Sequence, residues 1–181
     1  MSNIQSASED QNEIRDASVR VVVVAARFAL DEYRNYSAYI CLPHRTFQPC
    51  VRMAFYAQNK IDRRIPKIQG QIEAISGDEI ETRTDLTDSE RARLRTLLRK
   101  MEPARSEEWS KRQFKIVFLS PPDSADTLVL PDDIVNNLTT GSGRGTAFTR
   151  GQRYVSLARL EKGPKTTSDF PVSRWKKGKT R

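Results

Sequence analysis

Two apolar runs separated by a short polar turn constrain the fold of this chain more than any other feature. They lie within Arg45 to Ile75, on either side of Gln58-Asn59-Lys60. In the second run, Ile65 to Ile75, apolar and polar residues alternate strictly from Lys67 onward, which is typical of a half-buried strand. The first run, Val51 to Ala57, has no such alternation, as expected of a strand covered on both faces. The stretch therefore predicts two neighbouring strands.

Other segments have the composition of strands or helices. Val19 to Arg27 contains four consecutive valines, which favour a buried strand. Thr87-Asp88-Ser89-Glu90 matches a capping box and predicts a helix that ends before Pro103. Phe28 to Tyr39 predicts a short helix or an aromatic-rich loop. Further strands are predicted at Phe114 to Leu119, Thr127 to Leu130 and Tyr154 to Leu157, with a helix start at Pro131-Asp132-Asp133.

This order of elements predicts an α+β fold. About five strands are expected with one or two helices, and the two kinds of element do not alternate regularly, which favours a small mixed β-barrel or curled sheet. Residues 1–16 are polar, acidic and free of aromatics, which predicts a flexible leader. We expect residues 17–162 to form a single domain and residues 163–181 to form a basic, disordered tail.

The charge of the chain favours a polyanionic partner. The net charge is +8 and the pI is about 9.7. Residues 161–181 hold seven Lys and Arg against two Asp and Glu, so +5 of the charge lies at this end. Nucleic acid, either DNA or RNA, is the expected partner, and the tail could also dock an acidic protein. The longest apolar run, Val21 to Ala26, is too short to span a bilayer, and with only two cysteines we expect a cytoplasmic protein.

Cys41, His44 and Cys50 lie within ten residues and could bind a metal ion. A structural zinc site usually has four ligands, and the chain contains no other histidine or cysteine. Two core thiols and a loop imidazole are therefore the favoured interpretation. We expect no cofactor.

Two other motifs bear on catalysis. Asp78, Glu79 and Glu81 cluster after the second apolar run, and clustered carboxylates could hold Mg²⁺ in a nuclease, although no Glu-x-Lys follows them. The loop from Gly141 to Gly145 is typical of phosphate cradles but lacks the Walker lysine. We assign no catalytic residue, and the sequence favours a binding module over an enzyme.

Basic and aromatic residues concentrate around the connection between the two central strands. Such residues together suit base stacking and phosphate contact. The candidate nucleic-acid-binding residues are Arg45, Arg52, Phe55, Tyr56, Arg63, Arg64, Lys67, Trp109, Arg144 and Arg150.

The run RMAFYAQNKIDRRIPKIQGQIEAI resembles the middle of PUA-like domains, notably the EVE and ASCH branches. The later FKIVFLSPPDSADTLVLPDDI, followed by RYVSLARL, is similar in order to their closing strands. The resemblance implies a small mixed β-barrel with a cleft that recognises RNA, or a modified or flipped base in DNA. It also implies a reader module of the kind joined to restriction or modification systems. The basic helix from Thr87 to Met101 departs from this pattern as an insertion.

Three functional hypotheses follow. The first is a nucleic-acid-binding reader, with Phe55, Tyr56 or Trp109 stacking a base. The second is a metal-dependent nuclease of a defence or processing system that uses Asp78, Glu79 and Glu81. The third is a protein-interaction subunit that docks an acidic partner through its basic tail.

Overall fold

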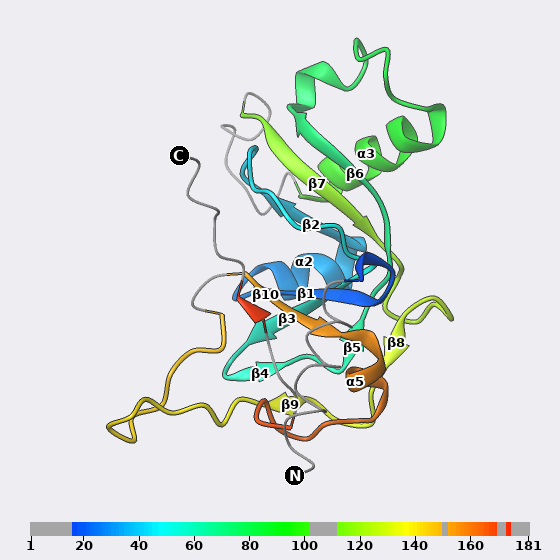
Figure 1. Cartoon of the computed structure of the whole chain (residues 1–181). Helices are drawn as coiled ribbons and strands as arrows, with labels where there is room; N and C mark the ends of the chain where they lie inside the picture. The colour runs from blue at the N-terminus through cyan, green and yellow to red at the C-terminus, as the bar shows by residue number, and fades with distance from the viewer. Residues whose placement is uncertain (1–15, 102–111, 150–151, 170–172, 175–181) are drawn as a thin grey trace.

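A computed structural model describes residues 16–101, 112–149, 152–169 and 173–174 (Figure 1). The helices are α2 (Ala29–Tyr36), α3 (Asp88–Met101) and α5 (Leu157–Glu161), with 3₁₀ turns η1 (Ala17–Val19) and η2 (Gly77–Glu79). The strands are β1 (Arg20–Ala25), β2 (Ala38–Cys41), β3 (Arg52–Ala57), β4 (Lys60–Ile61), β5 (Arg64–Ile65), β6 (Ile68–Ile75), β7 (Phe114–Leu119), β8 (Leu128–Val129), β9 (Ile134–Val135), β10 (Arg153–Ser156) and β11 (Ser173–Arg174).

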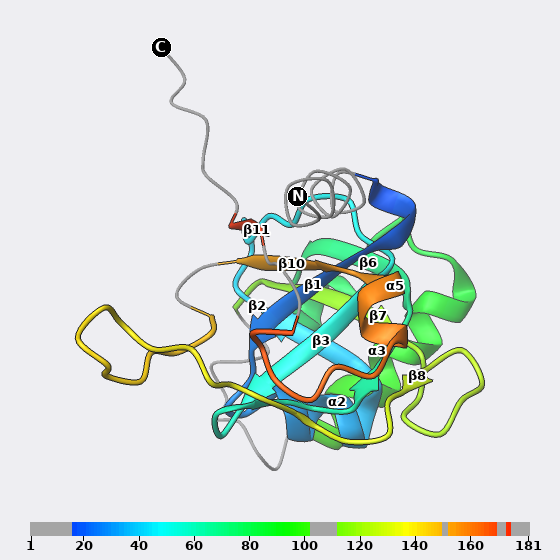
Figure 2. The ribbon, with the colours of Figure 1, turned by 60° about the horizontal axis from the view of Figure 1, so that its bottom comes forward.

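The strands form a strongly curled arrangement. One sheet has the order β11-β10-β1-β3-β4-β9, a second has β2-β7-β6, and β5 pairs with β8. Figure 2 shows β10, β1 and β3 side by side, with β1 antiparallel to β10 and parallel to β3. The first two sheets join where Arg52 bridges Lys67 and where the Ile68 N–H donates to the Val51 carbonyl at 2.9 Å. The predicted α+β fold with a curled sheet is confirmed.

The valine run explains why β1 lies at the centre of the fold. Val22 and Val24 point into the interior of the curl, whereas Val21 and Val23 point to the outer face, which α5 and the segment after β9 cover. All four side chains are at most 1% exposed. β3 is likewise covered on both faces, as its lack of alternation predicts. α3 covers the outer face of β2-β7-β6 with the apolar residues Leu94 and Leu97 (Figure 1).

Local sequence signals set several boundaries as predicted. The capping box at the start of α3 is present, because the Thr87 N–H donates to Glu90 Oε2 at 2.9 Å and the Glu90 N–H donates to Thr87 Oγ1 at 3.2 Å. The turn between β3 and β4 places Gln58 at φ 48° and Asn59 at φ 63°. Asparagine tolerates this left-handed backbone better than most residues, which suits it to a tight hairpin.

β2 is a strand that the sequence does not predict. It follows α2 directly because Ser37 adopts a left-handed backbone, φ 53°, and its N–H donates to the Tyr33 carbonyl at 2.8 Å. This ends the helix and turns the chain onto the sheet. All four residues of β2 are buried, so no alternation marks the strand in the sequence.

The predicted helix start at Pro131-Asp132-Asp133 is wrong. Ile134 is fully buried and pairs with Ile61 in the antiparallel β4-β9 ladder. Asp133 Oδ1 accepts the Arg63 N–H at 3.0 Å, so its carboxylate serves a neighbouring strand and caps no helix. Strand pairing and burial override the local helix signal here.

The folded part extends past the predicted boundary at residue 162. The Val135 N–H donates to the Lys165 carbonyl, and the Thr167 N–H donates to the Val135 carbonyl, at 2.9 and 3.0 Å. Thr167 is 2% exposed. Residues 163–169 therefore pack along β9. The predicted leader, apart from Asp16, and most of the predicted tail lie outside the described residues.

A buried amide network holds β4, β9 and the loop after β9 together. Asn136 is 6% exposed, and its Nδ2 donates to Asn59 Oδ1, Tyr56 Oη and the Thr146 carbonyl at 2.8–3.1 Å. Its Oδ1 accepts the Thr167 hydroxyl at 3.0 Å.

We expect Asn136→Ala to lower the free energy of unfolding by about 1–3 kcal/mol, because several buried partners lose a hydrogen bond. Urea denaturation measures this loss. Asn137→Ala is the control, since Asn137 is exposed and its Oδ1 accepts from the Thr167 hydroxyl and the Ser168 N–H, outside the network of Asn136 Nδ2. Equal losses for the two variants would contradict the proposed importance of the buried network.

Candidate nucleic-acid interface

The basic connection between β4 and β6 is largely neutralised by nearby carboxylates and carbonyls. Lys60 Nζ lies 4.0 Å from Asp133 Oδ2, and Lys67 Nζ lies 3.9 Å from Asp126 Oδ1. Arg63 Nη1 donates to the Pro131 carbonyl at 3.3 Å. These residues are exposed, but their charges have local partners that weaken the field they present to a ligand.

Two other basic candidates, Arg52 of β3 and Arg64 of β5, form hydrogen bonds within the fold. Arg52 Nη1 donates to the carbonyls of Ile65 and Asp126 at 3.1 and 2.6 Å, which ties β3 to β5 and to the segment before β8. Arg64 is half-buried in β5, and its N–H donates to Asp62 Oδ1 at 2.9 Å.

The structure places the two aromatic candidates of β3 in packing roles. Phe55 is fully buried and stacks on Tyr33, with ring centroids 4.9 Å apart and planes 17° apart. It therefore offers no face to a base. Tyr56 is half-buried, its ring lies 6.0 Å from that of Phe148, and its hydroxyl belongs to the Asn136 network. The expectation that Phe55 stacks a base is corrected by its burial.

The remaining sequence candidates lie elsewhere. Arg144 is exposed in the loop between β9 and β10, which extends away from the body of the molecule in Figures 1 and 2. Its N–H donates to Thr140 Oγ1 at 3.2 Å, within a turn in which Gly143 adopts φ 78°. Trp109 and Arg150 lie outside the described residues.

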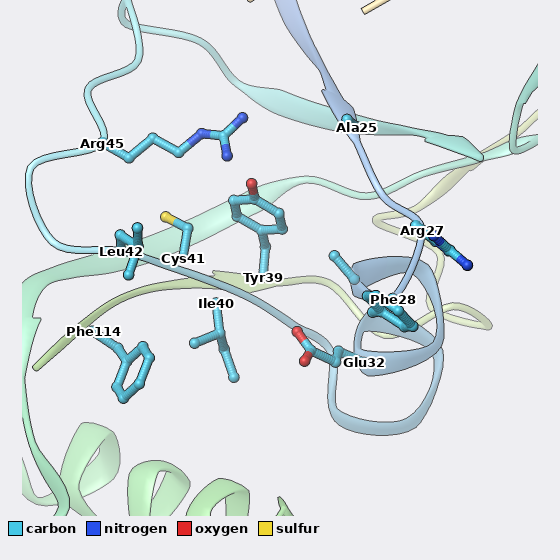
Figure 3. A pocket seen from close by; sticks show the side chains of 11 residues that line it. Ala25, Arg27, Phe28, Glu32, Tyr39, Ile40, Cys41, Leu42, Arg45 and Phe114 are labelled. Carbon is cyan, nitrogen blue, oxygen red and sulfur yellow. The ribbon is translucent and has the colours of Figure 1, made fainter. Parts of the chain in front are cut away.

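Arg45, in contrast, lines a cleft of about 410 Å³ at the open side of the curled sheet (Figure 3). β1 pairs with β10 and β3, so the curl does not close between β1 and β2. The loop after β2 crosses to β10 at one end of this opening, where the Gln48 N–H donates to Tyr154 Oη at 2.9 Å. The cleft lies at the other end. Its lining is Ala25, Arg27, Phe28, Ala29, Glu32, Tyr39, Ile40, Cys41, Leu42, Arg45 and Phe114.

Arg45 is held by two aromatic rings. Its guanidinium carbon lies 5.9 Å from the ring centroid of Tyr39 and 5.8 Å from that of Phe47, within the range of cation–π attraction. No carboxylate within the described part of the chain lies at ion-pair distance from Arg45. In Figure 3, Arg45 extends toward the hydroxyl end of Tyr39, and Glu32 lies on the opposite side of the cleft, beyond the backbone end of Tyr39. The site therefore combines a positioned cation, a carboxylate and an aromatic ring.

The backbone of β2 adds a polar edge to the cleft. β2 is the end strand of its sheet, and the Leu119 N–H donates to the Ser37 carbonyl at 2.9 Å. In an antiparallel ladder the residues that face the partner strand alternate, so Tyr39 and Cys41 direct their N–H and C=O groups toward β7. Ile40 directs its own groups the other way, and Ile40 lines the cleft. The cleft thus contains a backbone donor beside a backbone acceptor.

Two apolar side chains stand exposed at the mouth of the cleft. Phe28 is 72% exposed and Leu42 is 57% exposed. The Arg27 guanidinium carbon lies 5.4 Å from the centroid of the Phe28 ring. Figure 3 shows the Arg27 side chain directed away from Arg45. In the sequence, the only signal for this corner is the Arg27-Phe28 pair at the end of the predicted strand. Tyr39 carried no comparable signal, because β2 was not predicted, and Glu32 is one of several charged residues of α2 that the sequence does not distinguish.

Burial raises the pKa values of the groups beneath the cleft. The pKa of Tyr39 rises to about 12, and those of Cys41 and Cys50 rise from 9.0 to about 11, chiefly through desolvation. The Tyr39 phenol is therefore protonated at neutral pH and can donate a hydrogen bond. Both thiols are also protonated, which is expected of packing residues and not of activated nucleophiles.

These pKa values predict a loss of stability in alkali. An unfolded cysteine releases its proton near pH 9 and an unfolded tyrosine near pH 10, whereas Cys41 and Cys50 keep theirs to about pH 11 and Tyr39 to about pH 12. The folded state binds more protons between pH 9 and 12, so the free energy of unfolding falls as the pH rises through this window. Urea denaturation at pH 7, 9 and 10.5 measures the fall, which Cys50→Ala should reduce. A constant stability up to pH 11 would contradict the buried positions of these groups.

The other chemical motifs do not form a metal-binding cluster within the described residues. Across residues 16–101, 112–149, 152–169 and 173–174, no group of three His, Cys, Asp or Glu side chains is placed to hold a metal ion. His44 is exposed, with φ 70°. The Glu79 carboxylate accepts the Ser76 N–H at 2.8 Å, and the Glu81 carboxylate pairs with Arg95. These hydrogen bonds lower the pKa values of Glu79 and Glu81.

None of the described helices is long and apolar enough to cross a membrane. No protein-family model matches the chain, and no significant match was found among curated proteins or solved structures.

Proposed function

We propose that the protein is a nucleic-acid-binding reader that holds an unpaired base in the cleft between β1 and β2. The observation that carries this proposal is the position of Arg45 on the rings of Tyr39 and Phe47, facing a cleft of about 410 Å³. Small-molecule sites usually have volumes of roughly 300–1,000 Å³, so the cleft can accommodate a nucleotide. The PUA-like resemblance of the central run leads to the same expectation.

Each part of the cleft has a role in this proposal. Arg45 contacts a phosphate or a base edge, because its fork of N–H donors matches both. The N–H and C=O of Ile40 meet an adjacent acceptor and donor on the base. Hydrogen bonds of this kind identify a base without changing it, which suits a reader.

Binding of labelled single-stranded DNA and RNA over a salt series tests the proposal. Fluorescence anisotropy at several KCl concentrations should show that the logarithm of the binding constant falls linearly with the logarithm of the salt concentration, because phosphate contacts release counterions. A protein pre-treated with nuclease and polished on heparin is required, since a basic chain can carry nucleic acid through purification. The proposal would be overturned if the protein bound neither single-stranded DNA nor single-stranded RNA, or if its affinity did not depend on salt.

A further inference from the structure

A second groove lies on the other side of Phe28. It has a volume of about 420 Å³, and it shares only Arg27 and Phe28 with the cleft that Arg45 lines. Its other walls come from α2, from the β3-β4 turn and from the segment before β9. They comprise Leu30, Asp31, Arg34, Ala57, Gln58, Lys60, Asp62 and Asp133. The Arg27–Phe28 corner is therefore a partition between two concave surfaces of similar size.

The partition is exposed on both sides and is positioned by the fold. Phe28 precedes α2, and the N–H groups of Asp31 and Glu32 both donate to its carbonyl at 3.2 Å. The Ala26 N–H donates to the Tyr56 carbonyl at 2.9 Å, which ties the preceding backbone to β3. The Phe28 ring, 72% exposed, thus projects from a backbone that is bonded on both sides.

The two grooves offer different chemistry. The Arg45 cleft has a guanidinium held against the rings of Tyr39 and Phe47 and the β2 backbone edge, which together suit a phosphate or a base edge. The second groove contains three acidic and three basic side chains, counting Arg27. Arg34 is paired there with the buried Asp62, whereas the exposed Lys60 is paired with Asp133 at 4.0 Å, the limit of an ion pair, so a phosphate can replace Asp133 as its partner. Lys60 is thus the cation of this groove best placed to turn toward a phosphate.

We propose that Phe28 separates two consecutive nucleotides of a single strand, one in the Arg45 cleft and the next in the Lys60 groove. This inference rests on the proposed function and adds to it the class of ligand, a single-stranded segment of at least two nucleotides. Aromatic side chains hold single strands by stacking on bases, and apolar side chains inserted at a base step keep neighbouring bases apart. In a duplex the same insertion must first unstack a base step, so a single strand is favoured.

NMR titration of the full ¹⁵N-labelled chain with single-stranded 5′-phosphorylated oligonucleotides of one, two and four nucleotides tests the inference. We expect the dinucleotide to bind at least about tenfold more tightly than the mononucleotide, since stacking of a further base has an effect of this order. The mononucleotide should shift amides at residues 39–45, and the dinucleotide should also shift those at residues 58–60. A duplex of the same sequence should bind more weakly than the single strand.

Variants separate the inference from the function on which it rests. Phe28→Ala should remove the advantage of the dinucleotide, whereas Phe28→Trp should keep it. Lys60→Ala should weaken binding of the dinucleotide and leave binding of the mononucleotide unchanged. The matched control is Leu42→Ala, which removes another exposed apolar side chain of the cleft mouth but should leave the ratio of the two affinities unchanged.

Three results would overturn the inference. If the mononucleotide and the dinucleotide bind with equal affinity and Arg45→Ala lowers both affinities, the second site is absent but the proposed function stands. If Phe28→Ala leaves the ratio unchanged in a chain that remains folded by its NMR spectrum, Phe28 is not the partition. If no single strand shifts any amide of the cleft, both the inference and the proposed function fail.

Discussion

Phe55→Ala is expected to lower the free energy of unfolding by about 3–5 kcal/mol, the range found when a buried phenylalanine is truncated. Phe55 lies on the central strand β3, is 0% exposed and stacks on Tyr33 of α2. Its ring also faces Tyr39 of β2, with centroids 6.2 Å apart. Truncation leaves a cavity where β3, α2 and β2 meet, and these elements cannot collapse into it without breaking the ladders that hold them.

Chemical denaturation with urea measures the effect of Phe55→Ala. The matched control is Phe28→Ala, the same substitution at a residue that is 72% exposed, which should change stability by no more than about 0.5 kcal/mol. Together the two variants distinguish the structural phenylalanine from the proposed ligand-binding one. A loss below about 1 kcal/mol for Phe55→Ala would contradict the packing described for the interior of the curl.

Arg45→Ala has the largest expected effect on binding. We expect it to weaken the affinity for single strands by about 10- to 100-fold, as for the loss of a hydrogen-bonded charge. Stability should fall by no more than about 1 kcal/mol, the size of an exposed cation–π interaction, because no carboxylate within the described residues pairs with Arg45. Arg45→Lys should restore only part of the affinity, since an ammonium group keeps the charge but not the planar fork. Anisotropy titrations at one fixed salt concentration measure all three proteins.

Arg63→Ala distinguishes the Arg45 cleft from the basic connection between β4 and β6 as the nucleic-acid interface. Arg63 belongs to the basic connection that the sequence makes prominent, yet its side chain donates to the Pro131 carbonyl. We expect its loss to weaken binding less than threefold. An Arg63→Ala variant that loses as much affinity as Arg45→Ala would place the interface on the basic connection and would contradict the choice of the cleft.

The central strands could be predicted because their signals are local. The valines of β1, the alternation of β6 and the capping box of α3 each depend on neighbouring residues and survive in the structure. β2 could not be predicted in this way, because a short strand buried throughout carries no alternation. The error at Pro131 has a related cause, since pairing of Ile134 with Ile61 is a long-range contact that a local helix signal cannot reveal.

The candidate site was less accessible to sequence reasoning than the fold. The sequence places Arg63 and Lys67 close together along the chain. It does not show that carbonyl and carboxylate groups from the segment between β7 and β9 approach them. It shows Phe55 beside Tyr56, but alternation along a strand sends neighbouring side chains to opposite faces, and both faces of β3 are covered. Among the candidates that the structure describes, only Arg45 lines the cleft, and its ring partners are Tyr39 of the unpredicted β2 and Phe47 of the loop that follows.

Photo-cross-linking tests the central claim most directly, because it reports where a single strand lies. The protein is irradiated with a single-stranded oligonucleotide that carries 4-thiothymidine or 4-thiouridine, and cross-linked peptides are identified by mass spectrometry. We predict cross-links at Phe28 or Leu42, the exposed apolar side chains of the cleft mouth, and their loss in Arg45→Ala. Cross-links confined to the Arg144 loop or to residues 60–67 would contradict the assignment of the cleft as the nucleic-acid interface.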